Sequence, residues 1–332
     1  MIIDSFLFFQ ELDLLEIRLE YLYPVVDKFI IIEARQSFKG NTKDYIFEKN
    51  LKRYHKYLDK IIYHKIEDFH TSYDGLIEFL EKSNSKVYKK ISLFIQKHDY
   101  YDKKNLTYIL DSYHRECIHI ALDKNCKDED IILLSDLDEI PSFKIIKMLP
   151  QENIINDFSV FVQHEFQYYL NNYANNNWFG TIVSPYKIIK QYSLNQLRKN
   201  SRRFKIISYS GYHFTSIGNK ESIINKIENW GHQEFNHKMI KKNIEENIKN
   251  GKDIFYRLKI NKNKLINIDK TKIIDKRMTK ILLNFDKLII KDFKYNIFFN
   301  IKYFYNQILF ISQRIINNPK KFFKKIFFFL KY

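Results

Sequence analysis

Two aspartates separated by one residue follow an apolar run near the middle of the chain. Ile131–Leu134 lead through a serine into Asp136, Leu137, Asp138 and Glu139, and a proline follows at 141. If the chain stayed extended, alternation would place Asp136 and Asp138 on one side. Two neighbouring carboxylates favour a cation between them, and a divalent ion of the Mn²⁺ or Mg²⁺ type would keep positions open for phosphate oxygens. The alternative is a solvated acidic turn after a core strand.

The elements that must position this turn alternate along the first part of the chain. Segments 2–9, 29–32, 61–63 and 131–134, which are apolar except for Asp4 and Ser5, predict buried strands. A capping pattern at Asp13–Glu16 predicts a helix after the first strand, and Tyr113, Cys117 and Ile120 predict the inner face of another. This order predicts an α/β fold with a mostly parallel sheet flanked by helices. Ligands bind outside the carboxyl ends of such strands, which is where the acidic turn falls.

The remainder of the chain is expected to divide into an insertion, a second set of strands and a tail. Residues 72–110 fit the alternation poorly and predict a helical insertion. Extended segments are expected near 158–170, 181–189 and 205–217, and helices near 221–230 and 238–249. We place an α/β domain at 1–257 and a basic, aromatic helical tail at 258–332.

Composition excludes several classes of protein. The 332 residues include only 7 glycines, and no glycine-rich phosphate loop or G-x-G-x-x-G string occurs. Two cysteines suggest a reducing compartment without a disulfide framework. We find neither a signal peptide pattern nor an apolar run of about 20 residues that would span a bilayer. A cytoplasmic protein is therefore expected, free or attached to the inner face of the membrane.

Five separated strings over about residues 2–257 form a specific pattern when taken together. They comprise Asp4–Leu19, Tyr23–Phe29 with Ile32–Glu33, Leu134–Pro141, Gly211–Phe214 and His232–Asn236. In this order they resemble glycosyltransferase family 17, which contains β-1,4-mannosyl-glycoprotein β-1,4-N-acetylglucosaminyltransferase and bacterial relatives. The long segment 72–110, Tyr212 in place of an expected tryptophan, and the basic tail depart from the family pattern, so the acceptor stays open.

The resemblance implies a GT-A fold, a UDP-sugar donor (typically UDP-N-acetylglucosamine), Mn²⁺ or Mg²⁺, and inversion at the anomeric carbon. Such a transfer needs a cation against the leaving diphosphate and a base for the acceptor hydroxyl. Asp138 is expected to contact the metal, Asp136 the metal or the ribose, and Glu139 to orient them. His213 could be the distant third metal ligand, or a hydrogen-bonded histidine between two aromatic residues.

Two carboxylates are candidate bases, and both also suit a surface or structural role. Glu234 lies near a helix end, between His232 and Phe235. Glu165 lies within a strand-like run, where an inward carboxylate is costly unless it is used or paired.

Five further residues are candidates for substrate contacts. Glu11 and Glu33 end the first two strands, where uracil and ribose should lie, although a helix-capping role fits Glu11 equally well. Arg115 could bind diphosphate oxygens through its fork of donors, or form a surface ion pair. Trp178 and Phe179 could form an acceptor platform against a sugar face, or pack in the core.

The positive charge of the chain is concentrated at its end. From Asn236 onward there are 24 of the 56 Lys and Arg residues but only 7 of the 39 Asp and Glu residues. Aromatic and basic residues at helical spacing over 293–332 predict a helix at an anionic membrane surface, and a lipid-linked glycan acceptor would then follow. The alternative is a helical cap whose aromatic residues pack on the domain. No nucleic-acid recognition motif is present, so a nucleic-acid partner is not expected.

Two other functions compete with glycosyl transfer. A metal-dependent phosphohydrolase or nuclease could use the same acidic turn, but the chain lacks the additional carboxylates and histidines typical of a two-metal site. A non-catalytic relative that binds sugar or membrane is the second alternative, against which the presence of both aspartates argues.

Overall fold

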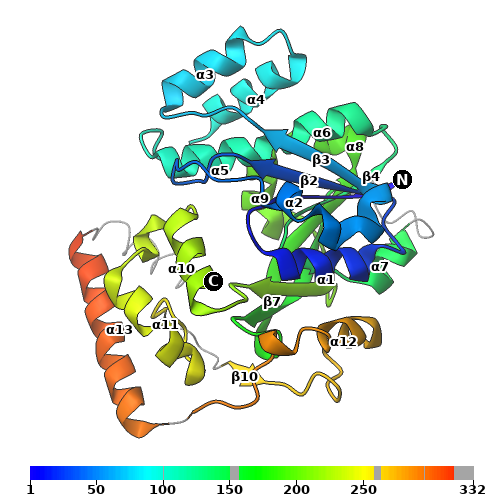
Figure 1. The fold of residues 1–332 in the computed structure, drawn as a ribbon. Helices are drawn as coiled ribbons and strands as arrows, with labels where there is room; N and C mark the ends of the chain where they lie inside the picture. Colours follow the sequence, from blue (N-terminus) through cyan, green and yellow to red (C-terminus); the bar gives the residue numbers. More distant parts are fainter. Residues whose placement is uncertain (100, 150–156, 258–262, 295, 318–332) are drawn as a thin grey trace.

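A computed structural model describes residues 1–99, 101–149, 157–257, 263–294 and 296–317. Its centre is a sheet of ten strands among these residues, with helices on both faces (Figure 1). The strands are β1 (Ile2–Phe8), β2 (Lys28–Ala34), β3 (Ile61–Ile66), β4 (Ile131–Asp136), β5 (Glu139–Pro141), β6 (Ser159–Gln167), β7 (Asn172–Pro185), β8 (Lys205–Ile207), β9 (Gly211–Thr215) and β10 (Lys264–Leu265).

The sheet combines a parallel half with a mixed half. Its main order is β3-β2-β1-β4-β7-β6-β9-β5, and the first four strands are parallel, as the apolar runs predicted. β7 then runs antiparallel to β4 and β6, and β9 runs parallel to β6 but antiparallel to β5. The chain leaves β1 toward β2 and β3 and returns on the other side as β4. The carboxyl ends of β1 and β4 therefore flank a topological switch point, the usual place for a ligand in such sheets.

Helices cover the two faces of the sheet through separate cores. One core packs α1, the 3₁₀ helix Leu51–Lys60, α7 and α12 on the sheet, and the other packs α3–α6, α8 and α9 on the opposite face. A third core joins α10, α11 and α13. The helices are α1 (Leu12–Leu22), α2 (Ile46–Lys49), α3 (Tyr73–Lys82), α4 (Lys86–Lys97), α5 (Leu106–Glu116), α6 (Ile118–Asn125), α7 (Phe143–Met148), α8 (Tyr186–Ile189), α9 (Leu194–Asn200), α10 (Lys220–Asn229), α11 (Lys238–Lys249), α12 (Lys276–Leu282) and α13 (Ile297–Asn317).

The helical character predicted for 72–110 is confirmed, whereas the capping pattern of the first helix is wrong. α3, α4 and the start of α5 occupy that segment. α1 begins at Leu12, and Asp13 and Glu16 lie inside the helix, where both form ion pairs with Arg53. Glu11 occupies the N-cap position, but its side chain does not cap the helix.

The expected boundary at residue 257 between a domain and a helical tail is also wrong. β10 pairs with β7, and α12 packs against α1 in the main core. The Tyr212 hydroxyl donates to the Asp275 carboxylate at 2.9 Å, which ties the segment before α12 to β9. Short apolar pieces of 264–289 thus complete the main domain, and the long helix of the expected tail is α13 alone.

Candidate functional site

The acidic turn lies at the switch point, and a buried arginine binds its backbone there. β4 ends at Asp136 and β5 begins at Glu139. Arg18 of α1 donates to the carbonyl oxygens of residues 136, 137 and 139 at 2.9–3.0 Å, and it pairs with Asp4 of β1 at 2.6 Å. Both side chains of this pair are fully buried. The backbone of the turn is therefore fixed by an ion pair that solvent does not reach.

The strand that faces the turn begins at a glycine that cannot be replaced without strain. Gly211 has a φ of +138°, and a Cβ atom there would lie 2.3 Å from the carbonyl oxygen of Ile140. This close approach lets β9 pair with β5 and places His213 directly opposite Glu139.

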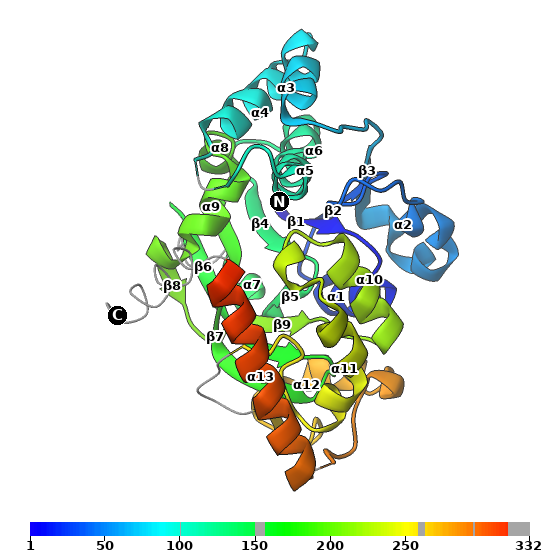
Figure 2. The same ribbon diagram turned by 90° about the vertical axis from the view of Figure 1, so that its left-hand side faces the viewer.

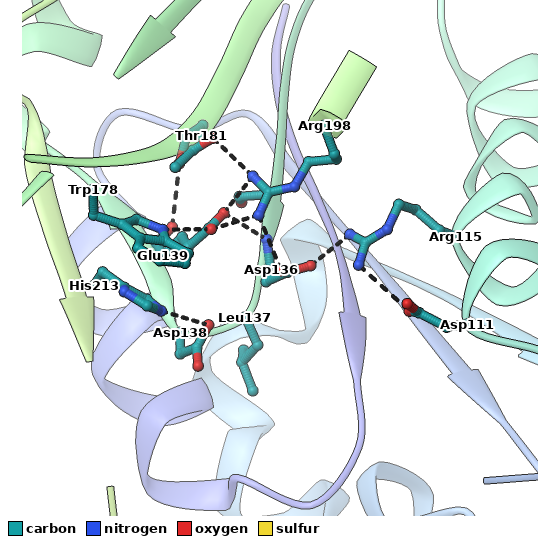
Figure 3. A network of polar contacts seen from close by, with 12 residues as sticks. Asp111, Arg115, Asp136, Leu137, Asp138, Glu139, Trp178, Thr181, Arg198 and His213 are labelled. Carbon is teal, nitrogen blue, oxygen red and sulfur yellow. Dashed lines mark hydrogen bonds and ion pairs between the residues drawn. The ribbon is translucent and has the colours of Figure 1, made fainter. Parts of the chain in front are cut away.

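Asp136 is held between two arginines. Its carboxylate contacts Arg115 of α5 at 2.5 Å and Arg198 of α9 at 3.0 Å, while Asp111 lies 3.6 Å from Arg115 (Figure 3). Burial opposes ionisation of Asp136, but the two guanidinium groups hold its pKa well below its usual range. The Asp136 side chain is nevertheless 37% exposed, so this carboxylate remains accessible to a ligand.

Asp138 points to a different set of partners. Its carboxylate oxygens lie 3.7 Å from His213 Nε2 and 3.2 Å from Lys226 Nζ of α10, and Lys226 is also 3.4 Å from Glu11. Burial lowers the pKa of Lys226, but Asp138 and Glu11 raise it above its usual value, so the ammonium stays charged. A protein cation therefore neutralises this carboxylate.

The expected convergence of the two aspartates is therefore wrong. The extended conformation ends at Asp136, because the chain turns at 137–138 before β5. In Figure 3 Asp136 points toward Arg115 and Arg198, whereas Asp138 points toward His213. The two carboxylates do not need one shared cation, because neighbouring helices supply separate basic side chains to each of them.

Asp138 and His213 could supply two ligands to a divalent ion. Within the described parts of the chain, no group of three His, Cys, Asp or Glu side chains could hold a metal ion. Asp138 and His213 provide one carboxylate and one imidazole close together, a pair that suits Mn²⁺. Ions of this type are commonly held by one or two carboxylates plus phosphate and water oxygens.

Glu139 connects the turn to the aromatic side of the site. This buried carboxylate accepts from Trp178 Nε1 at 2.8 Å and from Arg198 at 2.5 Å, and it also accepts from the backbone N–H of Asp136 at 3.0 Å. The Trp178 ring stacks on His213 with centroids 4.1 Å apart. Glu139 thus orients an arginine and a tryptophan at once.

Trp178 and Phe179 do not form one platform. Phe179 packs on the core beneath α3–α6, α8 and α9, and the Arg202 guanidinium lies 4.8 Å over its ring. Trp178 has one ring face covered by His213. The two rings therefore have different surroundings, with core packing for Phe179, and an acceptor contact by Trp178 stays a prediction.

The two candidate bases lie in different surroundings. Glu165 of β6 pairs in register with His213 of β9, and its carboxylate accepts hydrogen bonds from the side-chain amides of Gln167 and Asn175. Glu234 follows α10 and contacts His232 Nδ1 at 3.2 Å. Glu165 thus lies in a row of paired residues that continues through His213 to Glu139 of the acidic turn. Glu234 instead lies in the connection between α10 and α11.

Glu33 and Glu11, which were expected to meet the nucleoside, have separate roles. Both oxygens of the fully buried Glu33 are occupied by Lys43, the Tyr63 hydroxyl and the backbone N–H groups of Ile46 and Phe47. Four donors saturate a carboxylate, so this side chain anchors α2 and the hypothesis of a nucleoside contact loses its support. Glu11 remains at the carboxyl end of β1, paired with Lys226.

Sequence reasoning missed three basic residues of the site. Arg18 lies within the string Asp4–Leu19 but received no role there, Lys226 lies on a helix without a motif, and Arg198 lies 62 positions after the aspartate that it binds. For Arg18 a signal was present in the sequence, because this arginine occurs among the apolar residues that become the buried face of α1.

Comparison with known proteins assigns the chain to a family. The model of glycosyltransferase family 17 matches residues 1–90 and 71–262, which include the acidic turn, β9 and α10. A search of curated proteins found no match. The helix-flanked α/β sheet agrees with a GT-A-like fold. Because the family model covers well over half of the chain, the chain belongs to glycosyltransferase family 17.

Proposed function

We propose that the chain transfers a sugar from a UDP-sugar to a glycan acceptor, with inversion and with a divalent cation. The family supports glycosyl transfer itself. The observation that carries the proposal is the acidic turn at the carboxyl ends of β1 and β4, surrounded by Arg115, Arg198 and Lys226. Such a site combines ligands for a metal with cations for a diphosphate.

The donor diphosphate would bind between the acidic turn and these cations. Asp138 and His213 would hold Mn²⁺ or Mg²⁺, which neutralises charge on the leaving group when bound. Arg115 presents a fork of donors that suits phosphate oxygens, and Asp136 now occupies that fork. Asp136 would then be released to contact the ribose or the metal. N-acetylglucosamine as the sugar follows from the family likeness alone.

We assign the base to Glu165 in preference to Glu234. Glu165 is buried beside His213, so its carboxylate would lie near the reacting sugar. It accepts hydrogen bonds from two amides and has no ion-pair partner among the contacts described above. A carboxylate of this kind can accept the proton of an acceptor hydroxyl as the glycosidic bond forms.

The acceptor that we propose is a glycan or a lipid-linked glycan, presented at the inner face of the membrane to an enzyme in the cytoplasm. The basic end of the chain supports this placement. No helix in the described parts of the chain is long and apolar enough to cross a bilayer.

Donor-binding calorimetry tests the proposal. We expect UDP-N-acetylglucosamine to bind with Mn²⁺ present, and binding to weaken at least about tenfold with a chelator or in Asp138→Asn. Asp128→Asn is the matched control, because Asp128 pairs with Lys190 on the surface. Metal-independent binding, or full transfer activity of Asp138→Asn, would refute the metal assignment. A screen of other UDP-sugars in the same assay identifies the donor.

A further inference from the structure

The long helix α13 has two apolar faces; among the described residues one face is covered and the other is exposed. On its inner face Phe299, Tyr303 and Phe310 are buried in the core shared with isoleucines of α10 and α11. The Tyr303 hydroxyl donates to the carbonyl oxygen of Asp253 at 3.0 Å. The inner face therefore fixes the helix to the domain.

The outer face presents large apolar side chains to solvent. Their exposed fractions run from 37% to 82%, with Phe298 the highest. They recur three or four positions apart, as one face of a helix requires. The residues are Ile297, Phe298, Ile301, Phe304, Tyr305, Ile308, Leu309 and Ile316. In Figure 1 α13 lies at the edge of the molecule beside α11, and Figure 2, viewed from that side, shows it running across the front.

An exposed helix face formed by eight large apolar side chains marks an interaction site. The charge of the surrounding sequence indicates the kind of partner. Residues 293–332 contain eight Lys and Arg and no Asp or Glu. Within α13, Lys302 pairs with Glu246 and the Arg314 guanidinium lies over the Phe235 ring. Residues 318–332, whose structure lies outside the described ranges, add five lysines and five phenylalanines in sequence. This segment would repel a second copy of itself and attract an anionic surface.

We propose that the outer face of α13 lies in the interface of an anionic lipid bilayer, parallel to its plane. Phenylalanine and isoleucine side chains would enter the acyl boundary, and the net positive charge of residues 293–332 would favour anionic headgroups. This surface does not depend on the proposed transfer reaction.

Vesicle flotation with the full chain tests the proposal. We expect binding to vesicles of equal parts phosphatidylcholine and phosphatidylglycerol, and much weaker binding to phosphatidylcholine alone. Phe298→Glu with Phe304→Glu should lower the partition coefficient at least about tenfold, because it removes two apolar contacts and adds two negative charges. Leu58→Glu with Leu93→Glu is the matched control, since both leucines are exposed on other helices, and it should stay within about twofold of the parent.

Folding is checked separately, so that a loss of binding is attributed to the surface. All four substituted side chains are exposed, so melting temperatures should remain close to that of the parent, and Ile301→Ser with Ile308→Ser provides a milder second variant. Equal binding of parent and outer-face variants would overturn the proposal. It would also be overturned if the parent ignored phosphatidylglycerol, or if the variants only converted a dimer to a monomer.

Discussion

The buried pair that supports the acidic turn leads to the sharpest prediction. Arg18→Met keeps the length of the side chain but removes every donor that it directs at the turn. Asp4 would be left as a fully buried carboxylate without its partner, and three backbone carbonyl oxygens would lose their donor.

The expected loss of stability is large. Breaking a buried ion pair by removing one partner costs about 3–5 kcal/mol, because the remaining charge stays desolvated. A typical domain is stable by only about 5–15 kcal/mol, so the variant should lose about a fifth or more of its unfolding free energy. Carbonyl oxygens that find no water would add to this cost.

Urea denaturation of a double-mutant cycle measures the effect. Asp4→Asn leaves the arginine bonded to the turn carbonyls, whereas Arg18→Met does not. Both single variants should be destabilised, and the double variant should lose about 0.5–3 kcal/mol less than their sum. Activity per folded molecule should fall further in Arg18→Met than in Asp4→Asn, because only Arg18→Met removes the hydrogen bonds to the backbone of the acidic turn.

Two results would refute this reasoning. One is a cost below about 1 kcal/mol for Arg18→Met, which is the range of exposed ion pairs. The other is wild-type activity of that variant under conditions in which it is fully folded.

Three further predictions concern the site and the pH range of stability. Lys226→Gln removes an ammonium that competes with metal, so Mn²⁺ affinity of the donor-free protein should rise in calorimetry while transfer slows; unchanged affinity would contradict this competition. Glu165→Gln should lower kcat by about 10²–10⁴ with donor affinity kept, and Glu234→Gln should have a small effect; the reverse result would move the base. Burial lowers the pKa values of His114 and His119 to about 3. Only the unfolded chain then binds protons at these residues below about pH 6.5, so the unfolding free energy should fall between pH 6.5 and 5, by up to about 1.4 kcal/mol per histidine and pH unit. A flat profile in urea titrations would disprove the assignment of neutral histidines.

The sequence by itself determined the elements whose signal is local. Mainly apolar segments predicted β1 to β4, and the acidic turn was correctly placed at the carboxyl end of β4. Helical periodicity predicted α10 and α11 to within a residue or so. These features could be predicted because neighbouring residues share one backbone conformation, and their burial pattern repeats with its period.

Only the tertiary structure decided which charges meet. Asp136 binds an arginine 62 positions away, and Asp138 binds a lysine 88 positions away, through helices that carry no motif for either contact. Glu33 became an anchor for α2, and the two residues of β10 joined the sheet by pairing with β7. Such contacts depend on where distant segments cross, and that is set by the packing of the whole sheet and its helices. The spacing of residues along the sequence therefore does not predict these contacts.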